Sequence, residues 1–265
     1  MHDYLRTLKA DVVREVKESW QYRMGLMTDL IVQFLLYVGL LFAGKFTWLT
    51  RQYTAGSGES KSLLLIGFIF WSYSIAAISQ MGIDIGKEAS RGTLEQKFMA
   101  VVPPPVLLLG KAVGGIAVSS ILVVVMIAVS AILLGVDLNI TSAAILALGI
   151  TLLGMYGIGF IFAGIALVAK RTGQLIFLVQ LALLFLSGTF MPLEDMPVAI
   201  AVIGQSLPLT RGIDIARRAA GNYLPIRFQD WFMLTIASLA CLVIGLSAFS
   251  VADRQARKKG LLGKY

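Results

Sequence analysis

Residues 84–105, D-I-G-K-E-A-S-R-G-T-L-E-Q-K-F-M-A-V-V-P-P-P, form the most charged internal stretch of a very apolar chain and lie between two hydrophobic runs. Gly92 is expected to end the helix that arrives from the preceding run. Thr93 and Gln96 then give the T-x-x-Q pattern of a capping box, so a new helix can begin there. Pro103 starts a run of prolines, which lack the amide hydrogen of a helix and favour extended backbone. The segment therefore predicts a short, separately capped helix.

This short helix has one apolar face. Leu94, Phe98 and Val101 recur on it at helical spacing, and charged residues lie on the other sides. A capped helix with an apolar face between two membrane spans is a surface that another protein could contact. The alternative is a polar loop that touches only lipid headgroups.

The composition predicts an all-α membrane protein. Of the 265 residues, 57% are hydrophobic and 14% are charged, whereas soluble domains carry roughly a quarter charged residues. Several apolar runs reach or approach the ~20 residues that cross the ~30 Å hydrocarbon core as a helix. We therefore expect a polytopic helical membrane protein.

Six transmembrane spans are expected, at about 24–46, 62–83, 106–134, 142–169, 174–190 and 231–252. The fifth is only marginally long enough to cross. A tight turn at 135–141 predicts that the third and fourth spans form an antiparallel pair. Residues 1–265 would thus be a single transmembrane domain, with the spans within 24–252 and a basic tail at 253–265.

The N-terminal residues 1–23 predict an amphipathic helix rather than a signal peptide, because charges interrupt residues 4–22 throughout. Five apolar residues fall on one helical stripe, with charged residues on the remaining surface: Leu5, Leu8, Val12, Val16 and Trp20. Such a helix lies in the membrane interface. A solvated helix that packs on a partner is the alternative.

The region after the fifth span is broken by prolines. Its apolar part at 198–204 is too short to span, and residues 209–221 form a basic amphipathic segment. Two short helices flanked by prolines predict a re-entrant hairpin, which membranes tolerate where protein or water covers the backbone. A helical loop on the surface is the alternative.

The chain lacks the residues of most membrane catalysts. Cys241 is its only cysteine and His2 its only histidine, so an intrachain disulfide and histidine-based metal or acid–base chemistry are excluded. No paired carboxylates are expected at the membrane midplane, where ion-coupled transporters usually place ionisable groups. We predict no catalytic residue and no metal site, and energy for any uphill transport would have to come from another subunit.

Lysine and arginine set the orientation. With six spans both termini share one side, which holds 16 of these residues against 7 on the other. Both termini and residues 84–105 are therefore expected in the cytoplasm of a multi-pass protein of the cell inner or plasma membrane. The positive charge is a topology signal and not a nucleic-acid footprint.

Two motifs resemble the ABC-2-type transporter permeases. The first is E-A-S-R-G-T-L-E at 88–95 with Pro103 following, which is similar to the family's E-x-x-x-G-T-x-E…P segment. The second comprises S-G-T-F-M-P-L at 187–193, M-P at 196–197, L-P-L-T at 207–210 and D-I-A-R at 214–217. The resemblance covers essentially the whole chain, and its wording is closest to drug- and antibiotic-export permeases. The triple proline differs from the single proline typical of the family.

The resemblance implies a permease subunit without an ATPase site, which works with a second copy or a related permease and two cytoplasmic ATP-binding-cassette subunits that bind ATP and Mg. The coupling helix at the ATPase interface would involve Glu88, Arg91, Gly92, Thr93, Leu94, Glu95, Phe98 and Pro103. Residues 4–22 would be the interfacial helix, and the first and fifth spans would lie near the dimer axis. The re-entrant gate on the extracytoplasmic side would involve Gly188, Pro192, Pro197, Pro208 and Arg217.

The implied function is export of a hydrophobic or amphiphilic, drug-like substrate. Export of a lipid-linked glycan or another lipid is an alternative within the family. A membrane anchor that recruits a cytoplasmic partner without transport is an alternative of another class. A broken segment after the fifth span disfavours the anchor, which does not need one.

Overall fold

The computed structural model describes residues 21, 23–43, 49, 52–53, 59–90, 104–168, 173–190, 192–221 and 224–258. These residues are helical apart from short connections, and no strand occurs among them, which confirms the all-α prediction. The elements in chain order are α2 (Arg23–Ala43), α4 (Ser60–Ser90), α6 (Pro104–Leu134), α7 (Ser142–Val168), α8 (Gly173–Leu186), the short 3₁₀ helix η1 (Leu193–Asp195), α9 (Val198–Ser206), α10 (Pro208–Gly221) and α11 (Phe228–Lys258).

Five of these helices, α2, α4, α6, α7 and α11, are long and apolar enough to cross a membrane, and α9 with α10 makes a sixth candidate if the bent pair is one span. The helix within the predicted fifth span, α8, has 14 residues and is therefore about 21 Å long, short of the ~30 Å hydrocarbon core. It ends at Leu186 rather than near residue 190, and Gly188 follows with a positive φ of 69°.

Two helices are longer than predicted. α4 continues to Ser90 instead of ending near residue 83, and α11 runs from Phe228 to Lys258 instead of covering 231–252. No proline lies in either extension. Polar residues mark where a helix leaves the hydrocarbon core, but they do not end the helix. Hydropathy therefore located the spans correctly and underestimated the lengths of the helices.

The bundle is built around α4 and α7. In α4, 72% of the apolar window is buried, and in α7 56%, against 6% in α2. α7 packs along α11 at a close crossing, where a Cβ on Gly157 would overlap the backbone of Cys241 and Leu242. Small residues at such crossings let two membrane helices approach closely.

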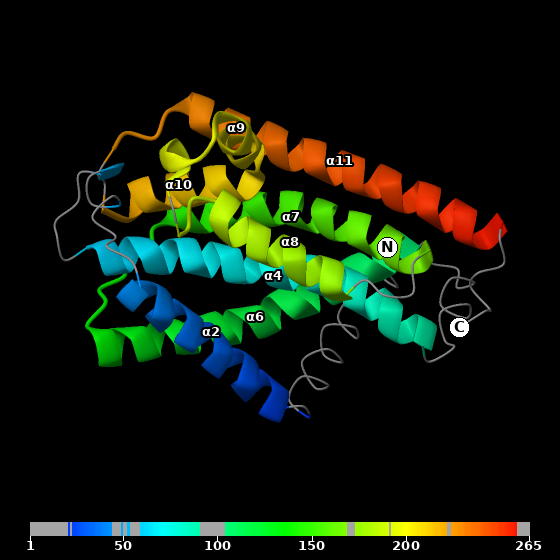
Figure 1. Ribbon diagram of the computed structural model, residues 1–265, viewed down its shortest axis with the longest axis horizontal. Helices are drawn as coiled ribbons and strands as arrows, with labels where there is room; N and C mark the ends of the chain where they lie inside the picture. The colour runs from blue at the N-terminus through cyan, green and yellow to red at the C-terminus, as the bar shows by residue number, and fades with distance from the viewer. Residues whose placement is uncertain are drawn as a thin grey trace.

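The third and fourth spans run antiparallel and are joined by residues 135–141. They contact each other through the Tyr156 hydroxyl of α7, which donates to the carbonyl of Ala112 in α6 at 2.9 Å, but each packs more extensively on α4. α4 lies between them, so that α6 contacts α4 and α2, while α7 contacts α4, α10 and α11 (Figure 1). The antiparallel direction of the two spans agrees with the prediction, and α4 covers a larger part of each span than the other does. A short turn fixes where two helices start and end, but packing depends on which neighbour covers each face.

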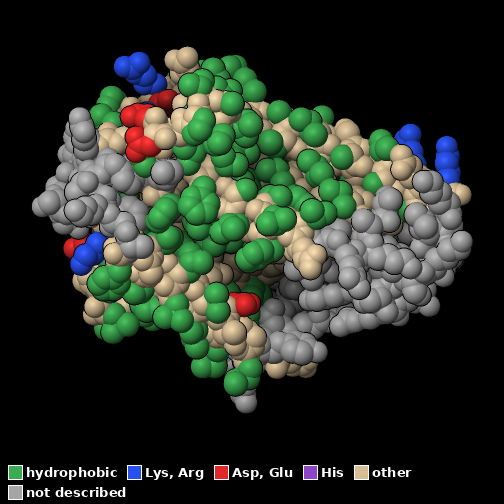
Figure 2. Space-filling view, in the orientation of Figure 1, with side chains coloured by type: hydrophobic (Ala, Val, Ile, Leu, Met, Phe, Trp, Pro, Cys, Tyr) green, Lys and Arg blue, Asp and Glu red, His purple; other side chains and the backbone are tan. Residues whose placement is uncertain are grey.

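The two ends of the bundle differ in the elements they carry. α4, α7 and α11 begin at one end, where α6 also finishes, and we call it the Ser60 end (Figure 1). Hydrophobic side chains cover the middle of the face seen in Figure 2, and most of the described Lys, Arg, Asp and Glu lie toward its two ends. This distribution fits a body that crosses a bilayer along its long axis.

Candidate functional site

The strongest candidate for a functional site is the segment that follows α8 at the Ser60 end, residues 187–221, which we call the broken segment. Pro197 precedes α9 and Pro208 begins α10, and the two helices meet at 76° across Leu207. Leu207 has extended backbone, with φ −72° and ψ 135°, as expected for a residue that precedes proline. The prolines therefore produce the break that they predict.

α10 is buried although it is the most polar of the described helices. Its buried residues are Pro208, Leu209, Gly212, Ile213, Ile215, Ala216, Arg217 and Ala220, and it packs on α7, α4 and α11. Protein thus covers its backbone, which is the condition for a non-spanning helix at membrane depth. The structure supports a re-entrant or broken element here over a loose loop on the surface.

Arg217 connects α10 to two other parts of the chain. Its exposed fraction is 1%, and it is the largest of the fully buried side chains described. Its Nε donates to the carbonyl of Leu63 at 2.9 Å, and Nη1 donates to the carbonyl of Gly188 at 2.9 Å. Nη2 donates to the carbonyl of Thr189 at 3.4 Å. The guanidinium therefore joins the first turns of α4 to the turn that follows α8.

The space for this guanidinium comes from a glycine on α4. A Cβ on Gly67 would overlap Arg217 Nη2. On another side, the ring of Tyr53 lies 5.9 Å from the Arg217 Cζ, within the range of a cation–π interaction. A buried charge is tolerated only where such partners compensate for the lost water.

A second polar network lies beside the first. The Tyr53 hydroxyl donates to Asp214 Oδ1 at 3.1 Å, and Arg218 forms an ion pair with the other oxygen of Asp214. Arg218 Nη1 also donates to Asp230 Oδ2 at 3.0 Å, which links α10 to the first turn of α11. Asp230 in turn accepts the backbone N–H of Arg227 at 2.9 Å.

The hydroxyl of Tyr53 is neutral in this network. Burial raises the pKa of Tyr53 to about 12; Arg217 opposes this shift and Asp214 adds to it. A protonated hydroxyl is the form that can donate to the Asp214 carboxylate.

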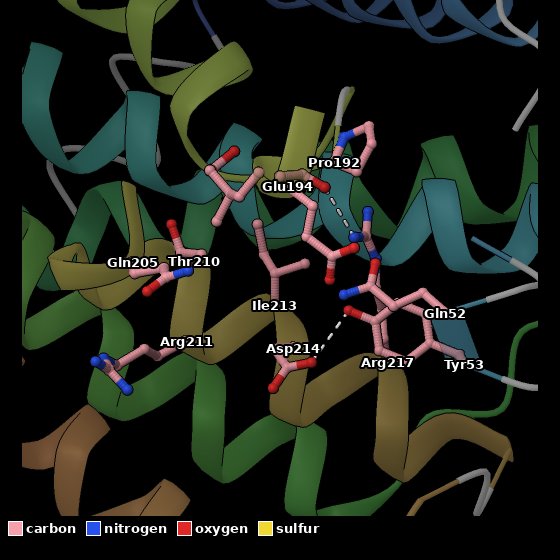
Figure 3. A pocket seen from close by; sticks show the side chains of 13 residues that line it. Gln52, Tyr53, Pro192, Glu194, Gln205, Thr210, Arg211, Ile213, Asp214 and Arg217 are labelled. Carbon is pink, nitrogen blue, oxygen red and sulfur yellow. Dashed lines mark hydrogen bonds between the residues drawn. The ribbon is translucent and has the colours of Figure 1, made fainter. Parts of the chain in front are cut away.

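A cavity of about 270 Å³ opens between these elements (Figure 3). It is lined from the loop after α2, the turn after α8, and the facing sides of η1, α9 and α10, by Gln52, Tyr53, Ser187, Gly188, Pro192, Leu193, Glu194, Gln205, Thr210, Arg211, Ile213, Asp214 and Arg217. Amides, hydroxyls and both signs of charge thus occur beside apolar side chains. This lining suits a molecule with polar and apolar parts.

The structure brings the predicted gate residues together. Gly188, Pro192 and Arg217 line the cavity, while Pro197 and Pro208 lie at the starts of the two helices that frame it. Their role as a gate stays a prediction. The predicted coupling and interfacial residues lie outside the described residues: Leu5, Leu8, Val12, Val16, Trp20, Arg91, Gly92, Thr93, Leu94, Glu95, Phe98 and Pro103. Glu88 lies in the last turns of α4, but its side chain is outside the described part.

Sequence reasoning did not select Tyr53 or Asp230, and it named Asp214 only as part of the D-I-A-R motif. Asp214 and Arg218 are four residues apart, a spacing that predicts an ion pair on a helix. No local pattern points to Tyr53, which lies 161 positions from its partner Asp214.

A different surface is formed by α2 and α8, which flank α4. Ser72 Oγ on α4 donates to Gln33 Oε1 on α2 at 2.8 Å, and Trp71 Nε1 donates to the carbonyl of Gln180 on α8 at 3.0 Å. Trp71 and Ser72 lie near the middle of the candidate span of α4, Ser60–Gly82. Among the residues described, no cluster of three or more His, Cys, Asp or Glu could hold a metal ion.

The family described as ABC-2 type transporter matches residues 6–220, which include the broken segment up to the last turn of α10. No curated protein matches the chain.

Proposed function

Because the chain belongs to the ABC-2 type transporter family, we propose that it is the permease subunit of an ATP-binding-cassette exporter. In this proposal two copies form the translocation pathway, and two separate cytoplasmic ATPase subunits hold ATP and Mg and supply the energy. The chain itself carries no ATPase site in this proposal.

The observation that carries the export proposal is the broken segment at the Ser60 end. A membrane anchor needs spans and a docking surface. It does not need a buried charged helix such as α10, which folds back beside the end of the short helix α8. The two networks of Arg217 and Asp214 give α10 a defined position relative to α4, α8 and α11. We propose that this element closes the extracytoplasmic end of the pathway.

The Ser60 end is extracytoplasmic in this proposal. The excess of lysine and arginine in the termini and the loops of the opposite end supports this orientation. α4 extends to Ser90, directly before the segment 91–103. The coupling helix would therefore follow α4 on the cytoplasmic side, where an ATPase subunit could press on it through Leu94 and Phe98.

We propose that the second copy faces α2 and α8. α2 has an apolar and largely exposed surface, with Ile31, Leu35 and Phe42 more than half exposed. Gln33 and Gln180 add amide groups on the same side of α4. Amide groups at membrane depth lie more favourably against another protein surface than against lipid.

The substrate proposed is hydrophobic or amphiphilic, as for a drug or an antibiotic. The cavity of the broken segment supports the amphiphilic form, because Glu194, Gln205 and Arg211 lie there beside Leu193 and Ile213. The same hydrogen-bonding groups would also suit a lipid-linked glycan, which remains the second candidate. Substrate-stimulated ATP hydrolysis by the purified complex, measured with both classes, separates the two.

The docking step is tested by Phe98→Ala in the complex with its ATPase. We expect membrane insertion to be unchanged while export falls and ATP hydrolysis loses its response to substrate. Phe228→Ala is the matched control, because Phe228 is 83% exposed at the Ser60 end and would lie on the other side of the membrane. If Phe98→Ala binds the ATPase normally and exports at the full rate, the docking proposal is wrong.

A further inference from the structure

The separation of α6 and α7 by α4 leaves a groove on the membrane-facing surface near the Ser60 end, which we call the α6–α7 groove. Its volume is about 260 Å³. The floor is formed by Ile66, Ile69, Phe70 and Tyr73 of α4, each no more than 8% exposed. The walls include Val124 of α6 and Ile145 of α7, which are 63% and 61% exposed. The groove therefore has a buried floor and open walls.

The dimensions of the groove fit a hydrocarbon chain. Its floor runs from Ile66 to Tyr73, and seven residues of helix correspond to about 10 Å along the axis. An acyl chain aligned with the spans would contact α4, α6 and α7 at once.

Polar groups lie at the mouth of the groove. Residues 138–140 of the α6–α7 turn, including Asn139, line the groove at the Ser60 end. Directly beside them, Lys61 Nζ donates to the carbonyl of Leu134 at 3.3 Å, and Ser62 Oγ donates to the carbonyl of Asp137 at 2.7 Å. The side chains of Lys61 and Asp137 are both exposed. One cation and one carboxylate thus lie at the Ser60 end of the α6–α7 groove.

We propose that the α6–α7 groove binds one phospholipid whose headgroup carries both a phosphate and a primary ammonium, as in phosphatidylethanolamine. One acyl chain would fill the groove, Lys61 would donate to the phosphate, and Asp137 would accept a hydrogen bond from the ammonium. The two contacts together favour a headgroup that carries both a phosphate and a primary ammonium. Phosphatidylglycerol has a phosphate but no ammonium, so it lacks the group that pairs with Asp137. A quaternary choline group cannot donate a hydrogen bond to the carboxylate.

The inference does not rest on the proposed export function, since it concerns a site on the lipid-facing surface. It is tested with the full chain in nanodiscs that contain equal amounts of phosphatidylethanolamine, phosphatidylglycerol and phosphatidylcholine. After transfer to detergent, native mass spectrometry counts the lipids that stay bound. We expect one phosphatidylethanolamine per chain, enriched about tenfold over the other two, as one charge-assisted hydrogen bond would give. Equal retention of the three lipids, or retention of none, would overturn the proposal.

Substitutions locate the lipid. Ala144→Trp should fill the groove from α7 and remove the bound lipid, and Val124→Trp should do the same from α6, so that a folding defect in one variant leaves the other. Ala240→Trp, at an exposed alanine of α11, is the matched control and should retain the lipid. Asp137→Asn should keep a bound lipid while losing the preference over phosphatidylcholine. Full retention in both groove variants would place the lipid elsewhere and overturn the site.

Discussion

α10 and α2 lie at opposite extremes of the molecule. α10 contains Arg211, Asp214, Arg217 and Arg218 in 14 residues, yet much of it is buried. α2 is a long apolar helix, and only 6% of its apolar window is buried. In a soluble protein the apolar helix would form the core. In a bilayer, lipid accommodates α2 as well as protein does, so burial follows polar contacts and small residues more than hydrophobicity.

The contrast between the buried α10 and the exposed α2 indicates which parts of the protein are rigid. The position of α10 depends on specific donors and acceptors, so we expect it to move together with α4 and the end of α8. Among the described elements α2 makes few contacts, which fits the proposal that its surface faces another copy.

Arg217→Met should have the largest effect on stability. It leaves the buried carbonyls of Leu63, Gly188 and Thr189 without this donor, and we expect a loss of about 3 kcal/mol or more. Thermal unfolding in detergent, followed by tryptophan fluorescence, measures it. Arg211→Met is the control on the same helix, because no described residue accepts a hydrogen bond from its side chain. Similar losses in the two variants would contradict the role given to Arg217.

Gly67→Ala should have the second largest effect on stability. A Cβ at this position overlaps the Arg217 guanidinium, and overpacking of this kind costs about 1–3 kcal/mol. Gly149→Ala is the matched control in α7, because nothing lies within 4 Å of its Cβ position. It should be neutral or slightly stabilising. A neutral Gly67→Ala would show that the guanidinium is not confined as described.

Tyr53→Phe should have a smaller effect, about 1 kcal/mol, because it keeps the ring and removes the hydroxyl that donates to Asp214. Its pH dependence gives a sharper test. The pKa of Tyr53 is raised in the folded chain to about 12, so its contribution is complete below the unfolded pKa near 10 and is lost as pH rises toward 12. Wild type should therefore lose stability relative to Tyr53→Phe over that range. Parallel curves for the two proteins would argue against a buried hydroxyl.

Ile31→Ala in α2 should change the stability of the single chain least, within about 0.5 kcal/mol, because Ile31 is 54% exposed. It should instead weaken association of two copies if α2 faces the second copy. Analytical ultracentrifugation in detergent separates the two effects. Unchanged association with a clearly lower unfolding temperature would reverse the contrast between α2 and α10.

Much of this architecture follows from sequence. The apolar runs located the helices, because hydrocarbon requires about 20 apolar residues whatever surrounds them. Pro197 and Pro208 located the break, because proline restricts the backbone at its own position and at the one before it. Arg217 was selected only through the family resemblance.

The rest depends on contacts between distant parts of the chain. Tyr53 and Asp214 are brought together by the packing of α10, and no local pattern encodes that distance. The short turn between α6 and α7 does not predict that α4 packs between these two helices. It decides where the groove lies, because lipid-facing sides of helices are all apolar and do not specify their neighbours.

We propose that a second copy covers the exposed surface of α2, whereas lipid covers the exposed surface of α11. Cysteine cross-linking in native membranes tests it directly, since the chain has a single cysteine, Cys241, that can be replaced by serine. Leu35→Cys on α2 and Val243→Cys on α11 start from the same exposed fraction, 62%. The account predicts that a short bifunctional thiol reagent cross-links two chains at Leu35→Cys, and not at Val243→Cys. Cross-linking at Val243→Cys without any at Leu35→Cys would contradict it.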